Sequence, residues 1–388
     1  MNMQARSNVL MRVAALSGEV AAAADTIEAT RRIPEPLLTH LHDARLFRLL
    51  LPRQFDGDEL DPGSYLLALE VLASEDASTA WNIFVGNSSA LIAPFIAAQS
   101  ARTIYSDPRS VISWGPPNAC KASAIDGGYR VSGRWDFSSG CRQANWMGAH
   151  CQVIEADGSL RLNTAGRPLI RTLLFAREQA TLLDTWNTIG LRGTASDSYE
   201  VQDLFVPEAF SGTREEPQLR TVAGPLYAFP MQGIYAVGVA GVALGVARAM
   251  LTTFTKLAQR KTPRGRSRLA DQNAVQAQVA KAEATLGAAR SYLLTTLDDV
   301  YAHADDMDII NVPDRARVRL SATHAILGAI EVADGIYKSA GVDAIFPGSP
   351  FERRFRDIHT LSQQIQARDA HYEAVGQVLL GVPPDVFL

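Results

Sequence analysis

The sequence predicts a mostly helical α+β protein built from three consecutive parts. Residues 1–107 repeat apolar side chains at three- and four-residue spacing, which is typical of amphipathic helices. Residues 108–215 change to short alternating runs separated by Gly and Asp, which favour strands and hairpins. Residues 216–388 return to the helical period. We therefore expect a helical domain, then a central β-barrel or β-sandwich domain, then a four-helix bundle.

Two helices are predicted in the N-terminal part. The first, over 37–50, begins after Pro34 and Pro36 and ends before Pro52, because proline suits a first helical turn but not a helix interior. The second covers 65–84, where YLLALEVLASEDASTAWNIF keeps the helical spacing.

A tight hairpin is predicted in the central part. DGG at 126–128 lies between two alternating runs, and this tripeptide favours the left-handed backbone that two-residue hairpin turns require. We expect two strands to meet at this turn.

Four helices are predicted in the C-terminal part. The segment 234–260 carries Gly and Ala on one side, which allows close helix packing, and 272–304 is a long amphipathic helix. Two more are expected near 314–340 and 351–381.

Composition excludes several classes of function. The chain has 388 residues, 47% of them hydrophobic, with a net charge of −4, so it offers no basic excess for nucleic acid. The N-terminus lacks a secretory signal and no apolar run is long enough to span a membrane, which favours a cytoplasmic location. Cys120, Cys141 and Cys151 have no CxxC spacing and the histidines share no spacing with carboxylates, so no metal site is predicted.

Four strings resemble the acyl-CoA dehydrogenases, in the right order along nearly the whole chain. YRVSGRWDFSSG at 129–140 is similar to the strand that lays a hydroxyl residue beside the flavin ring. TWNTIGLRGTASDSYEVQDLFVPE at 185–208 resembles the glycine-bearing strand pair that ends in Val-Pro. LAQRKTPRGRSRLADQNAVQAQVAKAEA at 257–284 and GVDAIFPGSPFERRFRDIHT at 341–360 resemble the family's helix-loop-helix and its Arg-Asp helix. The resemblance implies the acyl-CoA dehydrogenase fold.

Within that superfamily, the chain resembles the flavin-dependent hydroxylases more than the dehydrogenases. Dehydrogenation needs a carboxylate base, and neither the Glu-Gly-Thr segment nor the mid-helix Glu of the family is present. The segment WDFSSG at 135–140 resembles the corresponding segment of the flavin-dependent hydroxylases. The chain contains neither a GxGxxG nor a GxxxxGKS loop, so no site for NAD(P)H is predicted.

The resemblance therefore implies the oxygenase component of a two-component monooxygenase. A separate NAD(P)H:flavin reductase would deliver FMNH₂ or FADH₂, which reacts with O₂ to give a C4a-hydroperoxide that hydroxylates a small aromatic substrate. The choice between FMN and FAD stays open.

The resemblance also implies residues that contact the flavin. Ser138 matches the family's hydroxyl residue and is the first catalytic candidate, with Phe137 and Ser139 beside it. The alternative is that the two serines form a turn before Gly140. Arg260 resembles the Arg that reaches a flavin phosphate across a subunit boundary, which implies a homo-oligomer, a tetramer by resemblance. Its alternative is a solvated cation at a helix end.

Trp81, Asn82 and Asn87 are expected to line the substrate pocket, with core packing as the alternative. Several related hydroxylases place a His after the Arg-Asp pair, where this chain has Gln363, a candidate for substrate binding, and Gln364, a catalytic candidate. A glutamine can orient a substrate but cannot act as a general base near neutral pH.

The nearest histidine before this position is His359, the remaining catalytic candidate. Because an indole-type ring needs no deprotonation before oxygen transfer, the missing His favours such a ring over a phenol. The rival functions are an acyl-CoA dehydrogenase or oxidase with a moved base, N- or S-oxygenation on the same scaffold, and a catalytically inactive flavin-binding protein.

Overall fold

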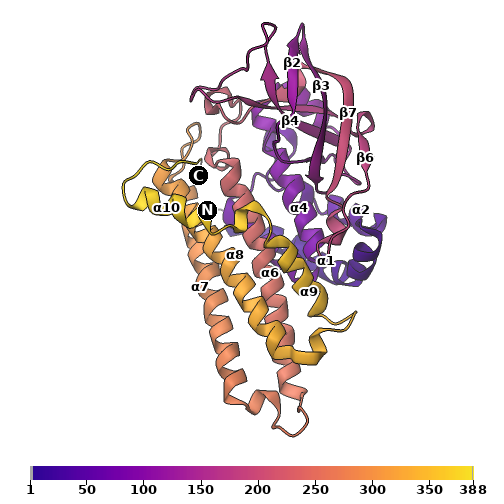
Figure 1. Cartoon of the computed structure of the whole chain (residues 1–388), viewed down its shortest axis with the longest axis vertical. Helices are drawn as coiled ribbons and strands as arrows, with labels where there is room; N and C mark the ends of the chain where they lie inside the picture. Colours follow the sequence, from indigo (N-terminus) through magenta and orange to yellow (C-terminus); the bar gives the residue numbers. More distant parts are fainter. Residues whose placement is uncertain (1–2, 387) are drawn as a thin grey trace.

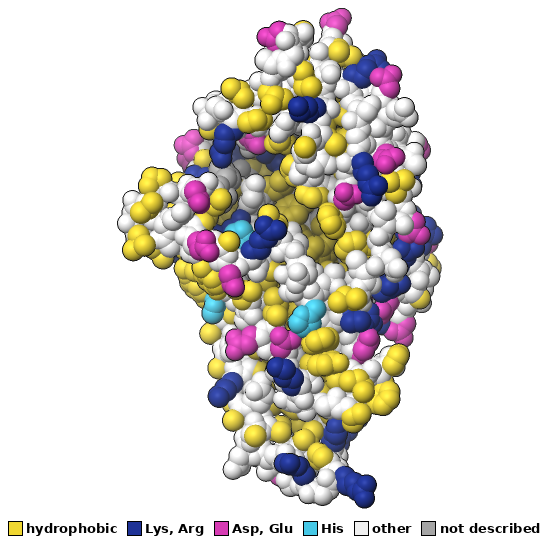
Figure 2. Space-filling view, in the orientation of Figure 1, with side chains coloured by type: hydrophobic (Ala, Val, Ile, Leu, Met, Phe, Trp, Pro, Cys, Tyr) yellow, Lys and Arg dark blue, Asp and Glu magenta, His cyan; other side chains and the backbone are white. Residues whose placement is uncertain are grey.

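The computed structural model describes residues 3–386 and 388. Figure 1 shows a β-sheet at one end, long helices that extend away from it, and N-terminal helices packed beside both. Figure 2 shows hydrophobic side chains gathered in a hollow between the sheet and the long helices.

The helices before the sheet are α1 (Met3–Thr30), α2 (Glu35–Asp43), α3 (Pro62–Glu75), α4 (Ala77–Ala90) and α5 (Ala98–Tyr105). The first predicted helix ends seven residues early, because the chain turns through a left-handed residue at Arg45 with φ of 60°. The second is divided at Asp76, whose extended backbone (φ −146°) ends α3. The Asp76 carboxylate accepts a hydrogen bond from Thr79 N at 2.6 Å and so begins α4.

The strands are β1 (Ile112–Trp114), β2 (Lys121–Ile125), β3 (Gly128–Ser138), β4 (Trp146–Ile154), β5 (Ile170–Ala176), β6 (Thr181–Leu183), β7 (Asp197–Pro207) and β8 (Ser211–Gly212). They form one sheet in the order β6-β7-β3-β2-β4-β5-β8, with β1 paired to β4 in parallel. The predicted hairpin is confirmed: Ile125 pairs with Gly128, and Gly127 has a φ of +75°.

Three long helices follow the sheet, α6 (Met231–Arg260), α7 (Asn273–His303) and α8 (Val312–Ala340), and confirm the sequence prediction. α6 is long and apolar enough to cross a membrane, but 83% of its most apolar stretch is buried inside the fold. Its small residues allow close packing, since a Cβ on Gly245 would lie 2.3 Å from the Glu70 carbonyl oxygen on α3. α6 is therefore the core helix of the bundle.

The predicted helix over 351–381 is wrong in its extent. The structure has two shorter helices, α9 (Glu352–Leu361) and α10 (Ala370–Leu379), with a 3₁₀ turn at Ile365–Ala367 between them. Gln364 caps that turn, because its side-chain Oε1 accepts from Gln366 N at 2.6 Å. Arg319 of α8 donates to the Gln366 side chain and holds the turn against the bundle.

Candidate functional site

Buried hydroxyl groups gather where β3 ends. The chain leaves the strand through Phe137 and Gly140, with φ of 61° and 76°. Ser138, between them, has no solvent exposure, and its hydroxyl lies 2.8 Å from Ser113 Oγ on β1. The adjacent Ser139 is also buried. The predicted turn and the predicted site thus coincide, because the turn aims these hydroxyls inward.

We call the set Ser113, Ser138, Ser139, Thr194 and Ser196 the hydroxyl cluster. Ser139 Oγ lies 2.6 Å from Ser196 Oγ, which lies 2.7 Å from Thr194 Oγ1. The first of these bonds joins the end of β3 to the segment before β7, so residues far apart in sequence form one polar group.

α4 borders the hydroxyl cluster with Trp81 and Asn82. Trp81 donates its Nε1–H to Ser139 Oγ at 3.1 Å. Asn82 donates to the Gly193 carbonyl at 3.1 Å, while its own Oδ1 is buried and has no hydrogen-bond partner among the described residues. Such an unpaired buried acceptor is costly unless a ligand satisfies it.

α9 contacts the hydroxyl cluster through Leu191. Thr194 Oγ1 donates to the Leu191 carbonyl at 2.8 Å, and Leu191 N donates to Asp357 Oδ1 at 2.6 Å. The backbone of Gly190 packs directly against α9: a Cβ at this position would lie 2.2 Å from the Arg356 carbonyl oxygen. Burial raises the pKa of Asp357 to about 7, although the Leu191 amide partly opposes the shift.

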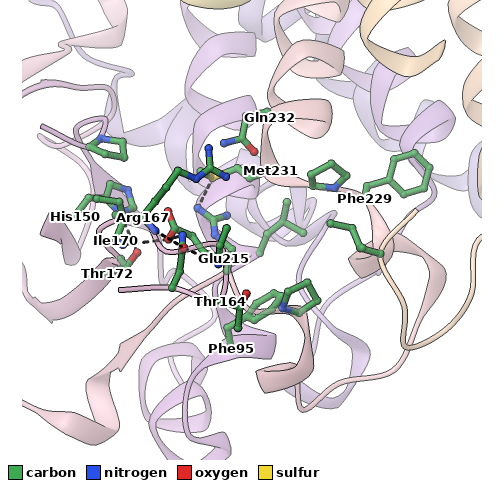
Figure 3. Close-up of a pocket in the computed structure, with 18 of the residues that line it drawn as sticks. Phe95, His150, Thr164, Arg167, Ile170, Thr172, Glu215, Phe229, Met231 and Gln232 are labelled. Atoms are coloured by element: carbon green, nitrogen blue, oxygen red, sulfur yellow. Dashed lines mark hydrogen bonds between the residues drawn. The ribbon is translucent and has the colours of Figure 1, made fainter. Parts of the chain in front are cut away.

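A cavity of about 480 Å³ lies between the sheet and the start of α6 (Figure 3). His150, Ile170 and Thr172 from the sheet lie on one side of it and Phe229 on another. Its lining comprises Leu91, Phe95, Pro117, His150, Asn163, Thr164, Ala165, Arg167, Pro168, Ile170, Thr172, Arg214, Glu215, Pro217, Tyr227, Phe229, Pro230, Met231, Gln232 and Ile309. The volume and mixed lining suit a small organic ligand.

Trp114 separates this cavity from the hydroxyl cluster. It follows Ser113 directly on β1, so the two side chains point to opposite faces of the strand. Its ring lies 4.8 Å from the His150 ring and 5.3 Å from the Arg214 guanidinium, both of which line the cavity. Trp114 Nε1 donates to the Tyr235 hydroxyl on α6 at 3.3 Å. One short strand thus serves both the hydroxyl cluster and the cavity.

The cavity residues His150 and Arg214 were not predicted from the sequence. His150 bonds through Nδ1 to Thr172 Oγ1 at 2.8 Å, and burial lowers its pKa to about 3. Burial also lowers the pKa of Arg214 to about 10. No motif surrounds either residue, so only their exclusion from bulk water in the fold could reveal them.

None of the site residues predicted from the sequence, Trp81 and Asn82 included, belongs to the lining of this cavity. Asn87 is fully buried and clamps backbone: its Oδ1 accepts from Leu50 N, and its Nδ2 donates to the carbonyls of Leu46 and Ile83. This is a structural role that leaves both amide hydrogens engaged. Phe137 is 63% exposed and meets the Trp186 ring edge to face.

Arg260 is exposed at the last residue of α6, and Figure 1 places that end of the bundle far from the sheet. In its own chain, Arg260 therefore cannot meet a ligand at the hydroxyl cluster. A role at that cluster would require a second subunit.

The three candidates near the C-terminus bond to their own surroundings. His359 Nε2 lies 2.8 Å from Asp334 Oδ1 on α8, and its ring packs against Phe355. Gln363 is exposed and Gln364 caps the turn after α9. Among the described residues, none of the three hydrogen-bonds to the hydroxyl cluster.

Comparison with known proteins identifies the family. Residues 11–101 match the family model "Acyl-CoA dehydrogenase, N-terminal domain", and residues 237–368 match "Acyl-CoA dehydrogenase, C-terminal domain". An indole-3-acetate monooxygenase of Pseudomonas putida is 30% identical over 343 residues, covering 87% of this chain and 85% of the relative. The oxygenase subunit HsaA of a flavin-dependent monooxygenase from Rhodococcus jostii is 29% identical, covering 90% and 92%.

A solved structure agrees with these relatives. The crystal structure of the HsaA monooxygenase from M. tuberculosis superimposes with a TM-score of 0.88 at 26% identity, covering 98% of this chain and 99% of that one. The chain therefore belongs to the acyl-CoA dehydrogenase superfamily, in the branch formed by the oxygenase components of flavin-dependent monooxygenases.

Proposed function

We propose that the chain hydroxylates a small, electron-rich aromatic substrate, preferring an indole-type ring to a phenol, with FMNH₂ or FADH₂ supplied by a separate reductase. The observation that carries this proposal is the 480 Å³ cavity with aromatic and apolar walls, which β1 links to the hydroxyl cluster through the adjacent residues Ser113 and Trp114. The name of the Pseudomonas putida relative, an indole-3-acetate monooxygenase, supports the ring type.

The hydroxyl cluster fits the polar edge of a flavin. Reduced flavin, when bound, activates O₂ for transfer of one oxygen atom to the substrate. The Ser138 hydroxyl, held by Ser113, can donate a hydrogen bond to a ring nitrogen, and the unpaired Asn82 Oδ1 can accept one from a ring N–H. Trp81 closes one side of the cluster and excludes water, which protects the activated oxygen from wasteful release.

The titratable groups around the cavity disfavour chemistry that begins with proton removal. His150, with its pKa near 3, is too weak a base at neutral pH. Glu215 is the one carboxylate on the described cavity lining, and its Oε2 is held by Asn163 and by Ile170 N. A phenol or an acyl thioester would need a base held at the reacting atom, whereas an indole-type ring is already nucleophilic.

We further propose a homotetramer in the cytoplasm. The apolar side chains of Val342, Ile345 and Phe346 are each more than half exposed at the end of the bundle where α6 stops. Lys261, next to Arg260, pairs with Asp343 of that same segment at 2.7 Å. Oligomerisation would cover this patch and bring Arg260 toward another subunit's flavin.

The test is a single-turnover reaction with isotopic oxygen. The purified chain is mixed anaerobically with dithionite-reduced FMN or FAD and then exposed to ¹⁸O₂ with indole-3-acetate, indole or phenol. We expect one ¹⁸O atom in the indole products and little phenol product, measured by mass spectrometry. Hydrogen peroxide alone with every aromatic, together with flavin reduction by an acyl-CoA thioester, would instead identify a dehydrogenase.

A further inference from the structure

Arg214 contributes an uncompensated positive charge to the cavity wall. It is partly buried and follows β8, where Thr213 bonds to the Glu215 amide and turns the chain toward the start of α6. Its Nη1 is shielded from solvent and has no hydrogen-bond partner within residues 3–386 and 388. Its Nη2 faces the sulfur of Met231, a weak acceptor.

No carboxylate neutralises this guanidinium in the described part of the chain. Arg214 forms no ion pair there, although the carboxylate Glu215 also belongs to the cavity lining. The face of Trp114, 5.3 Å away, gives the charge a cation–π contact. Burial lowers the pKa of Arg214 only to about 10, so the group remains protonated at neutral pH. A charge shielded from water and without a carboxylate partner costs free energy, and a bound anion would offset that cost.

We propose that Arg214 is the anchor for an anionic oxygen group, the carboxylate of an aromatic acid that occupies the 480 Å³ cavity. This assignment rests on the proposed function, because it names the substrate class of the same cavity. The guanidinium presents donors in a planar fork that matches a carboxylate. Nη1, the unpaired donor, is the atom that a carboxylate oxygen would satisfy.

The rest of the cavity suits the aromatic part of such an acid. Phe95, Tyr227 and Phe229 offer apolar faces, and the neutral His150 adds a polar contact without a second charge. A flavin phosphate has the same anionic chemistry. We assign the carboxylate instead because the cavity walls around Arg214 are mostly apolar and because the hydroxyl cluster, which fits the flavin, lies beyond Trp114.

The experiment measures binding without reduced flavin or O₂, so it does not depend on turnover. Dissociation constants for indole-3-acetate and for its neutral isostere indole-3-acetamide are measured by calorimetry on the wild type, Arg214→Gln and Arg214→Lys. We expect the wild type to prefer the acid by about tenfold or more, as for a charge-assisted hydrogen bond. Arg214→Gln should abolish that preference and leave amide binding within about threefold, and Arg214→Lys should keep part of it.

Arg167→Gln is the matched control, because Arg167 is an exposed cation on the same cavity lining. It should leave the acid-to-amide ratio nearly unchanged. The proposal is overturned if Arg214→Gln keeps the ratio, or if Arg167→Gln abolishes it. It is also overturned if Arg214→Gln weakens FMN relative to riboflavin while the acid preference survives.

The two proposals fail in distinguishable ways. Loss of the acid preference in Arg214→Gln with no ¹⁸O incorporation in any product would keep the anion site and reject the monooxygenation. Oxygenation of indole, with equal affinity of the wild type for acid and amide, would keep the monooxygenation and reject the anion site. Each variant is first compared with the wild type by circular dichroism and thermal unfolding, and Arg214→Lys carries the test if Arg214→Gln does not fold.

Discussion

Ser138 is held at the end of β3 with no solvent exposure, and its hydroxyl lies 2.8 Å from Ser113. If this hydroxyl holds a flavin nitrogen, Ser138→Ala should lower the product formed per reduced flavin by about tenfold or more, with the lost oxygen appearing as hydrogen peroxide. Product and peroxide are measured together in the single-turnover reaction.

Ser113→Ala is the comparison for this prediction, since it removes the partner but leaves the Ser138 hydroxyl in place. We expect an intermediate yield from it. Full coupling in Ser138→Ala would remove this residue from the proposed mechanism.

His150 makes a pH-dependent contribution to stability. The unfolded chain protonates this imidazole below its ordinary pKa of 6.5, whereas in the folded chain burial lowers the pKa to about 3. Between these values the unfolded state binds the extra proton, so the contribution is complete above pH 6.5 and is lost as the pH falls toward 3.

His150→Asn should therefore remove a slope of about 1.4 kcal/mol per pH unit from the free energy of unfolding between about pH 6 and 4. Urea titrations of both proteins across that range measure the slope. The buried His42 titrates with the same sign, its pKa lowered to about 4, and Asp357 with the opposite sign. His42 and Asp357 titrate in the wild type and in the variant alike. Parallel plots of unfolding free energy against pH for the two proteins would therefore contradict the prediction.

At the scale of elements, the contact between the Gly190 segment and α9 supports the site. Any side chain on Gly190 would press on the Arg356 carbonyl and lengthen the bond from Leu191 N to Asp357. Gly190→Ala should destabilise the fold by about 1–3 kcal/mol and also weaken flavin binding, because Leu191 supports the hydroxyl cluster through Thr194.

Gly287→Ala on α7 is the matched control, since a Cβ there meets nothing within 4 Å. It should stabilise the fold by about 0.5–1 kcal/mol, as expected for alanine in place of glycine inside a helix. Denaturant unfolding and flavin fluorescence titration measure both variants. Equal effects of the two substitutions would show that the contact with α9 does not matter.

At the scale of the whole molecule, the position of Arg260 predicts that one site needs two subunits. Ser138 ends β3 in the sheet, whereas Arg260 ends α6 at the far end of the bundle from that sheet (Figure 1). Ser138→Ala and Arg260→Gln should each be poorly active alone, the second through weaker flavin binding. When the two variants are co-expressed, mixed oligomers should regain activity, because some sites combine an intact Ser138 with an intact Arg260 from a neighbour.

Light scattering coupled to gel filtration establishes the number of subunits in the same preparations. Arg264→Gln, in the exposed segment after α6, is the control and should bind flavin like the wild type. If mixed oligomers form without any gain in activity, the shared site is wrong.

Local sequence patterns were enough to locate most of the elements and to recognise the family. Apolar spacing located α6, α7 and α8, and Asp126 with Gly127 located the hairpin, because local backbone preferences and one-sided burial act over a few residues. The motif WDFSSG located the end of β3 and led to Ser138, whose surroundings are set largely by the adjacent turn.

The assembly of the site depends on contacts between distant segments, which appear in the fold alone. It divided the predicted helices at Asp76 and after Leu361, where side-chain caps outweigh the apolar period. It turned Asn87 to the backbone and brought His150 and Arg214, from separate segments, to one cavity. The properties of these two side chains come from their exclusion from water and, for Arg214, from the lack of a carboxylate partner. Both depend on residues distant in sequence, so local sequence spacing does not predict them.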